Sequence, residues 1–305
     1  MRSLLPFGML LGLFACATPP PLQVDAELRT DVETMLRELG PNVQAGIWLG
    51  QPGQPALLEL GAATPLPVAS AIKAAFLIEL FGAFADRLDE PMPGIDAALA
   101  DPDHLALAHF TPQLRDEART ALRGATVRRL GEAMITSKGV SNPTYNIAAN
   151  LVIAHFGGPR AFTERLHARA ASAQDLQVRR YMLADRVADG DNTATAAALA
   201  GTHSMLAQNE VPGIDPRAVE AARAVLATAD DGEWRTFHKG GALDSDPVTR
   251  VEAGWHEGPR GAVVHVVMLA QSGVPMAQRE VAGKQLARTA KAIEQRLVQG
   301  LRTAP

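Results

Sequence analysis

The sequence is poor in cysteine and has no excess of positive charge. A single cysteine among 305 residues excludes a disulfide framework, a four-cysteine zinc site and a CxxC redox pair. The 29 basic and 33 acidic residues give a formal net charge of -4, so we expect no nucleic-acid partner. The eight histidines are scattered along the chain and form no HExxH motif. The sequence therefore predicts no metal site.

Apolar residues, by contrast, are abundant. They make up 47% of the sequence against 20% charged residues, which is enough to bury a full-sized core in one or two domains. The same composition excludes a disordered, collagenous or coiled-coil protein. An apolar run at residues 4–15 is too short to span a bilayer as a mature helix. We interpret residues 1–15 as a secretory signal peptide.

The signal peptide is predicted to end at the single cysteine. Leu13-Phe14-Ala15-Cys16 resembles a bacterial lipobox, and this resemblance implies cleavage before Cys16 and a lipid on its thiol. We therefore expect export across the inner membrane, with the protein held on the periplasmic side by that lipid alone. Residues 16–24, which include three consecutive prolines, would form a stiff tether. The alternative is an ordinary signal peptide with a cysteine near its cleavage site.

The hydrophobic pattern places strands at both ends of the chain and helices between them. Strands are predicted at 43–49, 56–60, 234–238, 249–256 and 262–270. Helices are predicted at 25–39, 69–88, 126–135, 145–156, 159–170, 193–208, 216–228 and 277–301. Residues 171–191 show no period and are predicted to be a surface loop. The run 262–270 predicts a strand covered on both faces, in which we expect His265 to be a core histidine with its hydrogen bonds satisfied.

This order of elements predicts an α/β (α+β) fold with one largely antiparallel sheet. The early and late strands would pair in a sheet lobe, residues 25–62 and 232–305, covered by helices from both chain ends. Residues 69–231 would form an all-helical lobe, with a cleft between the two lobes. Both lobes belong to one predicted catalytic domain, residues 25–305.

A serine and a lysine one helical turn apart open the helical lobe. In Ser70-x-x-Lys73, the spacing puts the lysine amine and the serine hydroxyl on one helix face, where a neutral amine can take the hydroxyl proton. The start of a helix also stabilises a developing oxyanion, because its N–H groups are unpaired and its dipole is positive there. The pattern predicts a nucleophile and its base. The alternative is a helix-capping serine beside an exposed lysine.

A second motif lies at the start of a later helix. The segment from Thr144 to Leu151 resembles the Ser-Asp-Asn-Thr-Ala-Ala-Asn-Leu helix start of class A β-lactamases. Aligned on the shared Ala-Ala-Asn-Leu, Asn146 keeps the asparagine, Tyr145 replaces the aspartate and Thr144 replaces the serine. Ser141 is a rival donor of that hydroxyl. The alternative for Thr144 is a helix N-cap.

A third motif ends the first late strand. Lys239-Gly240-Gly241 resembles the Lys-Thr/Ser-Gly element on the cleft-edge strand of penicillin-recognising enzymes, although Gly240 lacks the middle hydroxyl. Taken alone, these three residues are more typical of a hairpin turn. They support the resemblance because they follow the two earlier motifs in the order found in that family.

The three motifs together resemble class A serine β-lactamases and related penicillin-binding hydrolases, over nearly the whole chain after Cys16. The resemblance implies that Ser70 attacks an acyl carbonyl with Lys73 as general base. It also implies that the N–H groups of Ser70 and Ala242 bind the oxyanion, and that Thr144 and Lys239 relay a proton to the leaving nitrogen. Asn146 would orient the substrate and Lys73. Gly241 would let the substrate approach the backbone closely, and Arg250 would bind a substrate carboxylate.

One departure from the family concerns the loop before Asn192. Class A enzymes carry a glutamate there that activates the water for deacylation, but here Arg180-Tyr181-Met182-Leu183 occupies that place. Residues 171–191 contain no glutamate. Asp185 is a possible substitute, which we interpret as a solvated loop acid. We therefore expect deacylation to be slow.

The resemblance implies a monomeric hydrolase that needs no cofactor. It would form an acyl-enzyme with a small-molecule β-lactam or a related amide, such as a peptidoglycan peptide. The alternatives are a D-Ala-D-Ala-type peptidase and a non-catalytic peptidoglycan-binding lipoprotein. The altered positions Tyr145 and Gly240 and the missing loop glutamate keep the binding protein open as an interpretation.

Overall fold

The structure, a computed structural model, describes residues 26–303. The predictions for the signal peptide, the tether and Cys16 concern residues outside this range. Within it, no helix combines the length and the apolar character needed to cross a membrane.

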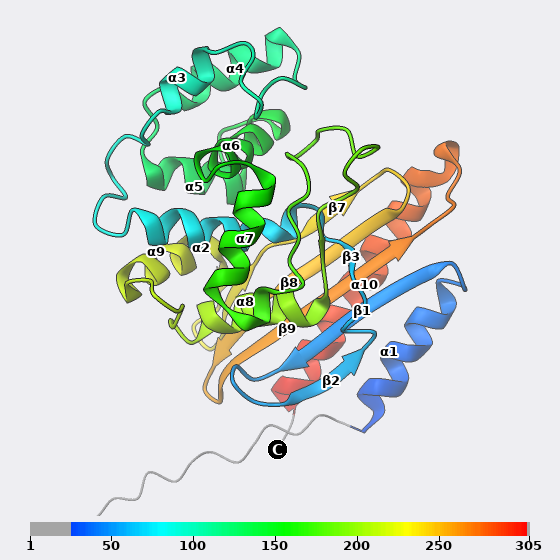
Figure 1. Cartoon of the computed structure of the whole chain (residues 1–305). Coiled ribbons are helices and arrows are strands. Elements are labelled where there is room, and N and C mark those ends of the chain that lie inside the picture. The colour runs from blue at the N-terminus through cyan, green and yellow to red at the C-terminus, as the bar shows by residue number, and fades with distance from the viewer. Residues whose placement is uncertain (1–25, 304–305) are drawn as a thin grey trace, which may run out of the picture.

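An antiparallel sheet of seven strands forms the centre of the molecule (Figure 1). Its strands are β1 (Val43–Gly50), β2 (Ala56–Leu60), β5 (Ala227–Asp230), β6 (Arg235–His238), β7 (Gly241–Leu243), β8 (Val248–Gly258) and β9 (Gly261–Gln271). The order is β2-β1-β9-β8-β6-β5, and β7 also pairs with β8. β1 pairs with β9 along its whole length, from Val43 with Gln271 to Gly50 with Val264. The predicted pairing of early with late strands is confirmed.

The two terminal helices, α1 (Glu27–Glu38) and α10 (Arg279–Thr303), cover one face of the sheet, which we call the back face (Figure 1). Successive side chains of β9 point to opposite faces of the sheet, and residues 263–270 are all buried. Both faces of this strand are therefore covered, as its apolar run predicts. The back-face core contains Leu28, Val32, Ile47, Leu49, Val263, Val267, Leu269, Leu286, Ile293 and Leu297.

The opposite face, which we call the front face, is covered by the helical lobe. The helices there are α2 (Lys73–Ala83), α3 (Ile95–Ala100), α4 (Pro112–Leu122), α5 (Val127–Thr136), α6 (Asn142–His155), α7 (Pro159–Arg169), α8 (Ala196–Ala207) and α9 (Pro216–Leu226). α8 packs directly on the sheet. α2 is the central helix, and every residue from Lys73 to Phe81 is buried. Its one carboxylate, Glu79, is fully buried between Arg165 and Arg169 of α7.

Several predicted boundaries were wrong. The helix predicted at 69–88 begins as a 3₁₀ turn, Ala69–Ile72, and α2 ends at Ala83. The helix predicted at 193–208 is split into the short strand β4 (Thr193–Ala194) and α8, because Thr195 caps α8 through the N–H of Ala198. Helices α3 and α4 and strands β3 (Leu66–Pro67), β5 and β7 were not predicted.

Candidate active site

Ser70 is held in place by a short strand pair and a strained residue. β3 pairs with β4, and Val68 N donates a hydrogen bond to Asn192 O at 3.0 Å. Ala69 has a φ of +49°, in the left-handed region that costs a residue with a Cβ about 1 kcal/mol or more. The half-buried Ser70 follows at once, in the 3₁₀ turn that leads into α2. Backbone strain is therefore stored next to the candidate nucleophile.

Lys73 is fully buried and bonded to the start of α6. Its Nζ donates to Asn146 Oδ1 at 2.9 Å and to Tyr145 O at 3.4 Å. Burial, and next the positive charge of Lys239, hold the pKa of Lys73 well below its ordinary value. The neutral amine, which is the form that can accept a proton, is thereby favoured.

The ring of Tyr145 acts in the opposite direction on Lys73. Its centroid lies 3.1 Å from Lys73 Nζ and 5.3 Å from Lys239 Nζ, and the face of an aromatic ring stabilises a cation. Such a contact is worth about 0.5–2 kcal/mol. The pKa of Lys73 is nonetheless lowered, with burial as the largest cause. Sequence reasoning assigned no role to Tyr145, which nonetheless contacts both lysines.

The two rival hydroxyls of the second motif lie together at the start of α6. Ser141 is the N-cap, and its Oγ accepts from Thr144 N at 3.4 Å and donates to Thr144 Oγ1 at 3.2 Å. Thr144 is fully buried. Asn146 Nδ2 donates to Asn142 O at 2.9 Å, which turns the amide oxygen of Asn146 toward Lys73. The helix thus presents one oriented amide and one hydrogen-bonded hydroxyl pair.

The third motif brings strand β7 against Ser70. A Cβ on Gly241 would lie 2.8 Å from Val68 O and 2.9 Å from the backbone N atoms of Ser70 and Ala71. Only glycine therefore allows β7 to come so close. Lys239 is almost fully buried, and its Nζ donates to Gly240 O at 3.1 Å.

A hollow of about 110 Å³ opens beside Ser70. Asn142 and Asn146 of α6 and Ala242 of β7 line it together with Ser70. Ser70 and Ala242, which come from the start of the helical lobe and from the edge of the sheet, thus line the same hollow.

The other wall of the hollow is the loop before β4. Met182 and Asp191 line it from this loop. Asn150 fixes the backbone of Met182, because its Oδ1 accepts from Met182 N at 2.6 Å and its Nδ2 donates to Met182 O at 3.1 Å. The Asp191 carboxylate is bound by Arg180 at 2.6 Å and by Arg186 at 3.1 Å. Asp191 is the only acidic residue lining the hollow within residues 26–303, and it is already paired.

Two predicted residues lie away from the hollow. Asp185 is exposed and accepts a hydrogen bond from Val187 N at 2.9 Å, in agreement with a solvated loop acid. Arg250 donates to Asp244 Oδ1 at 2.6 Å and to the carbonyl oxygens of Leu243 and Thr249. A substrate carboxylate at Arg250 must therefore compete with Asp244.

Sequence reasoning missed Asn142 and the ion pair between Arg180 and Asp191. The signal for Asn142 was its place directly after a capping serine and before Pro143, which starts α6 earlier than predicted. The ion pair had no local signal, because its two residues meet only through the course of the loop.

The fold is similar to that of class A serine β-lactamases. The model of the β-lactamase enzyme family matches residues 27–297, and the chain belongs to that family.

Solved structures agree with this assignment of fold. A variant of the last common ancestor of the class A β-lactamases of Gram-negative bacteria is 19% identical and has a TM-score of 0.62, with coverage of 88% of this chain and 99% of that chain. A variant of the TLA-1 extended-spectrum β-lactamase is 14% identical and has a TM-score of 0.66, with coverage of 89% and 98%. No curated protein matches the sequence significantly.

Proposed function

We propose that this protein hydrolyses a β-lactam or a related amide through an acyl-enzyme formed on Ser70, and that it deacylates slowly. Lys73 takes the proton of Ser70, and the N–H groups of Ser70 and Ala242 bind the oxyanion. The hydroxyl pair of Ser141 and Thr144, with Lys239, returns a proton to the leaving nitrogen. Asn146 orients Lys73 and the substrate.

The observation that carries the proposal is the state of Lys73. It stands one turn from Ser70, is fully buried, has a lowered pKa and is oriented by Asn146. A lysine kept only for structure would be expected to pair with a carboxylate, but the acceptors of Lys73 are an amide oxygen and a carbonyl oxygen. This environment suits a general base for a serine nucleophile.

Slow deacylation follows from the loop wall of the hollow. Met182 has no proton-accepting group, and Asn150 holds its backbone in place. Asp191 faces two arginines, which keep its carboxylate occupied. A water on the acyl group therefore lacks a strong base, and the acyl-enzyme should accumulate.

The proposal can be tested by mixing the protein with a chromogenic cephalosporin and weighing it intact within seconds. We expect a burst of about one equivalent, a mass increase on the Ser70 peptide and slow turnover. Ser70→Ala should abolish the adduct, whereas Ser272→Ala, a matched loss of one hydroxyl at an exposed serine after β9, should retain it. A stable adduct together with cleavage of a D-Ala-D-Ala peptide would support the peptidase alternative. No adduct at all would support the non-catalytic binding protein.

We also propose that a lipid on Cys16 anchors the protein on the periplasmic side of a membrane. The support is the sequence Leu13-Phe14-Ala15-Cys16 after a short apolar run. Cys16→Ser should block processing and move the protein from the membrane fraction to the soluble fraction. Unchanged membrane association of this variant would contradict the anchor.

A further inference from the structure

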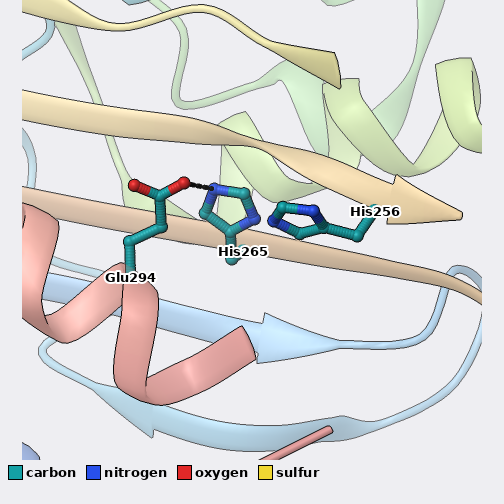
Figure 2. Close-up of side chains that lie close together, drawn as sticks. All are labelled: His256, His265 and Glu294. Atoms are coloured by element: carbon teal, nitrogen blue, oxygen red, sulfur yellow. Dashed lines mark ion pairs between the residues drawn. The ribbon is translucent and has the colours of Figure 1, made fainter. Parts of the chain in front are cut away.

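Three buried side chains of the types that bind metal ions meet on the back face of the sheet (Figure 2). His256 comes from β8, His265 from β9 and Glu294 from α10. One ligand atom of each lies within 4.8 Å of those of the other two. His265 pairs with Gly254 across the β8–β9 ladder, which makes His256 its diagonal neighbour on the same face.

His265 lies in the middle of this cluster and is 1% exposed. Neither of its ring nitrogens has a hydrogen-bond partner among the described residues. Its Nε2 lies 3.5 Å from Glu294 Oε1, within ion-pair range but without a hydrogen bond. His265 is therefore a core histidine as predicted, but the prediction that its hydrogen bonds are satisfied is wrong. A buried polar group in this state is unfavourable unless something binds it.

The spacing of the ligand atoms suits a small cation. Two atoms that each lie about 2.1 Å from a zinc ion, at the tetrahedral angle, are about 3.4 Å apart. His265 Nε2 and Glu294 Oε1 are 3.5 Å apart. All three ligand atoms lie within 4.8 Å of one another, so the side chain of His256 needs a shift on the order of 1–2 Å to complete the set.

The surroundings favour an oriented ligand set. Thr236 Oγ1 and His256 Nδ1 lie 3.0 Å apart in a hydrogen bond, which fixes that ring in the way that outer partners fix metal-binding histidines. Lys291 competes for Glu294, because its Nζ lies 2.6 Å from Glu294 Oε2. Its side chain is 55% exposed and free to turn outward.

We propose that His256, His265 and Glu294 bind one zinc ion, which ties the β8–β9 hairpin to α10. Two imidazoles and one carboxylate are a ligand set that suits zinc and other late transition metals, whereas calcium and magnesium prefer oxygen ligands alone. The site lies on the sheet face opposite the helical lobe, so its ion stabilises the fold and takes no part in the reaction at Ser70.

The test uses the full chain without a histidine tag, stripped with a chelator. Titration with Zn²⁺ should show about one bound ion per chain and should raise the midpoint of thermal unfolding by several degrees. Co²⁺ in the same site should give visible absorption bands of a nitrogen- and oxygen-ligated ion. Less than about 0.2 equivalents of zinc on the wild-type protein would overturn the proposal.

Two variants and a matched control locate the ion. His265→Gln and Glu294→Gln should each weaken zinc binding by at least about tenfold. His203→Gln removes another fully buried histidine whose ring nitrogens have no hydrogen-bond partner among residues 26–303, and it should leave binding unchanged. Equal loss in all three variants, or binding retained in His265→Gln, would contradict the site.

A fourth variant covers the case in which the buried substitutions do not fold. Lys291→Gln changes a surface side chain and removes the competitor for Glu294, so zinc affinity should rise by about two- to fivefold. Unchanged or weaker binding in Lys291→Gln would overturn the assignment of Glu294 as a ligand.

Discussion

The front and back faces of the sheet each hold a buried base whose pKa is lowered by burial, Lys73 in front and His265 behind. Lys73 has two oxygen acceptors and stands one turn from Ser70 beside an open hollow. His265 has no hydrogen-bond partner among the described residues and faces an imidazole and a carboxylate. A lowered pKa thus reports burial in both places, and the groups that face the base decide what it can do.

The largest expected effect is the loss of acylation in the front-face variant Lys73→Met. Methionine keeps most of the buried volume but has no amine, so acylation of Ser70 should slow by about 10²–10⁴-fold. The unfolding free energy should change by less than about 1.5 kcal/mol, because a near-isosteric apolar residue replaces a desolvated base. Rapid-mixing mass measurement and denaturant unfolding give the two values. Acylation at the wild-type rate would show that Lys73 is not the base.

The pH profile sharpens the same prediction. The acylation rate of the wild-type protein should fall as the pH drops through the lowered pKa of Lys73, because the ammonium cannot accept a proton. Lys239→Met removes the positive charge that helps to lower this pKa, so the acid limb of the profile should move to higher pH. An acid limb at unchanged pH would mean that another group controls the pH dependence of acylation.

A smaller effect is expected from adding a base to the loop wall of the hollow. Met182→Glu should speed hydrolysis of the acyl-enzyme by roughly 10²-fold, the lower end of the effect of a positioned general base. Met182→Gln has the same length without the charge and should leave the lifetime of the adduct unchanged. The lifetime is read from the decay of the heavier mass after excess drug is removed. Equal lifetimes in both variants would contradict the view that a missing base limits turnover.

Gly241→Ala tests the contact between β7 and Ser70. Its Cβ would lie within 2.9 Å of three backbone atoms, so the strand must move, at a cost of about 1–3 kcal/mol in unfolding free energy and with slower acylation. Gly240→Ala is the milder control, since its Cβ meets nothing nearer than 3.1 Å. Thermal unfolding and the acylation rate of the two variants should differ in that order. Equal effects would show that the close approach is unimportant.

A third buried base, His203 of α8, faces neither the hollow nor a ligand set. Burial lowers its pKa from 6.5 to about 3. The unfolded chain therefore binds a proton that the folded chain does not, so stability is complete above about pH 6.5 and is lost as the pH falls toward 3. The slope is at most about 1.4 kcal/mol per pH unit. His203→Gln should reduce the slope of the unfolding free energy against pH in this range. An unchanged slope would contradict the view that His203 causes it.

Local spacing was enough to predict much of the front face. Ser70 lies in the 3₁₀ turn that leads into α2 and Lys73 begins α2, so the two remain about one turn apart. The pairing of early with late strands followed from apolar runs at the two chain ends. α4 also had a local signal, Thr111-Pro112, but no helix was predicted there. Thr111 is the N-cap and accepts a hydrogen bond from Leu114 N, and Pro112 lies in the first turn.

The remaining features depend on tertiary contacts that no local pattern encodes. Tyr145 contacts two lysines that come from the start of α2 and from the edge of the sheet. The histidine cluster needs the register of β8 with β9 and the docking of α10, which together place His256, His265 and Glu294 side by side. The scattered positions of the histidines in the sequence therefore gave no sign of this cluster.

The position of β1 has a consequence for the order of folding. β1 lies between β2 and β9, and its partner on one side is the last strand of the chain. During synthesis, residues of the helical lobe can meet their neighbours soon after they emerge, whereas Val43 must wait for Gln271. Until then the β1–β2 hairpin has an open edge able to pair with another chain. Conditions that hold the nascent chain unfinished should therefore favour its aggregation through this hairpin.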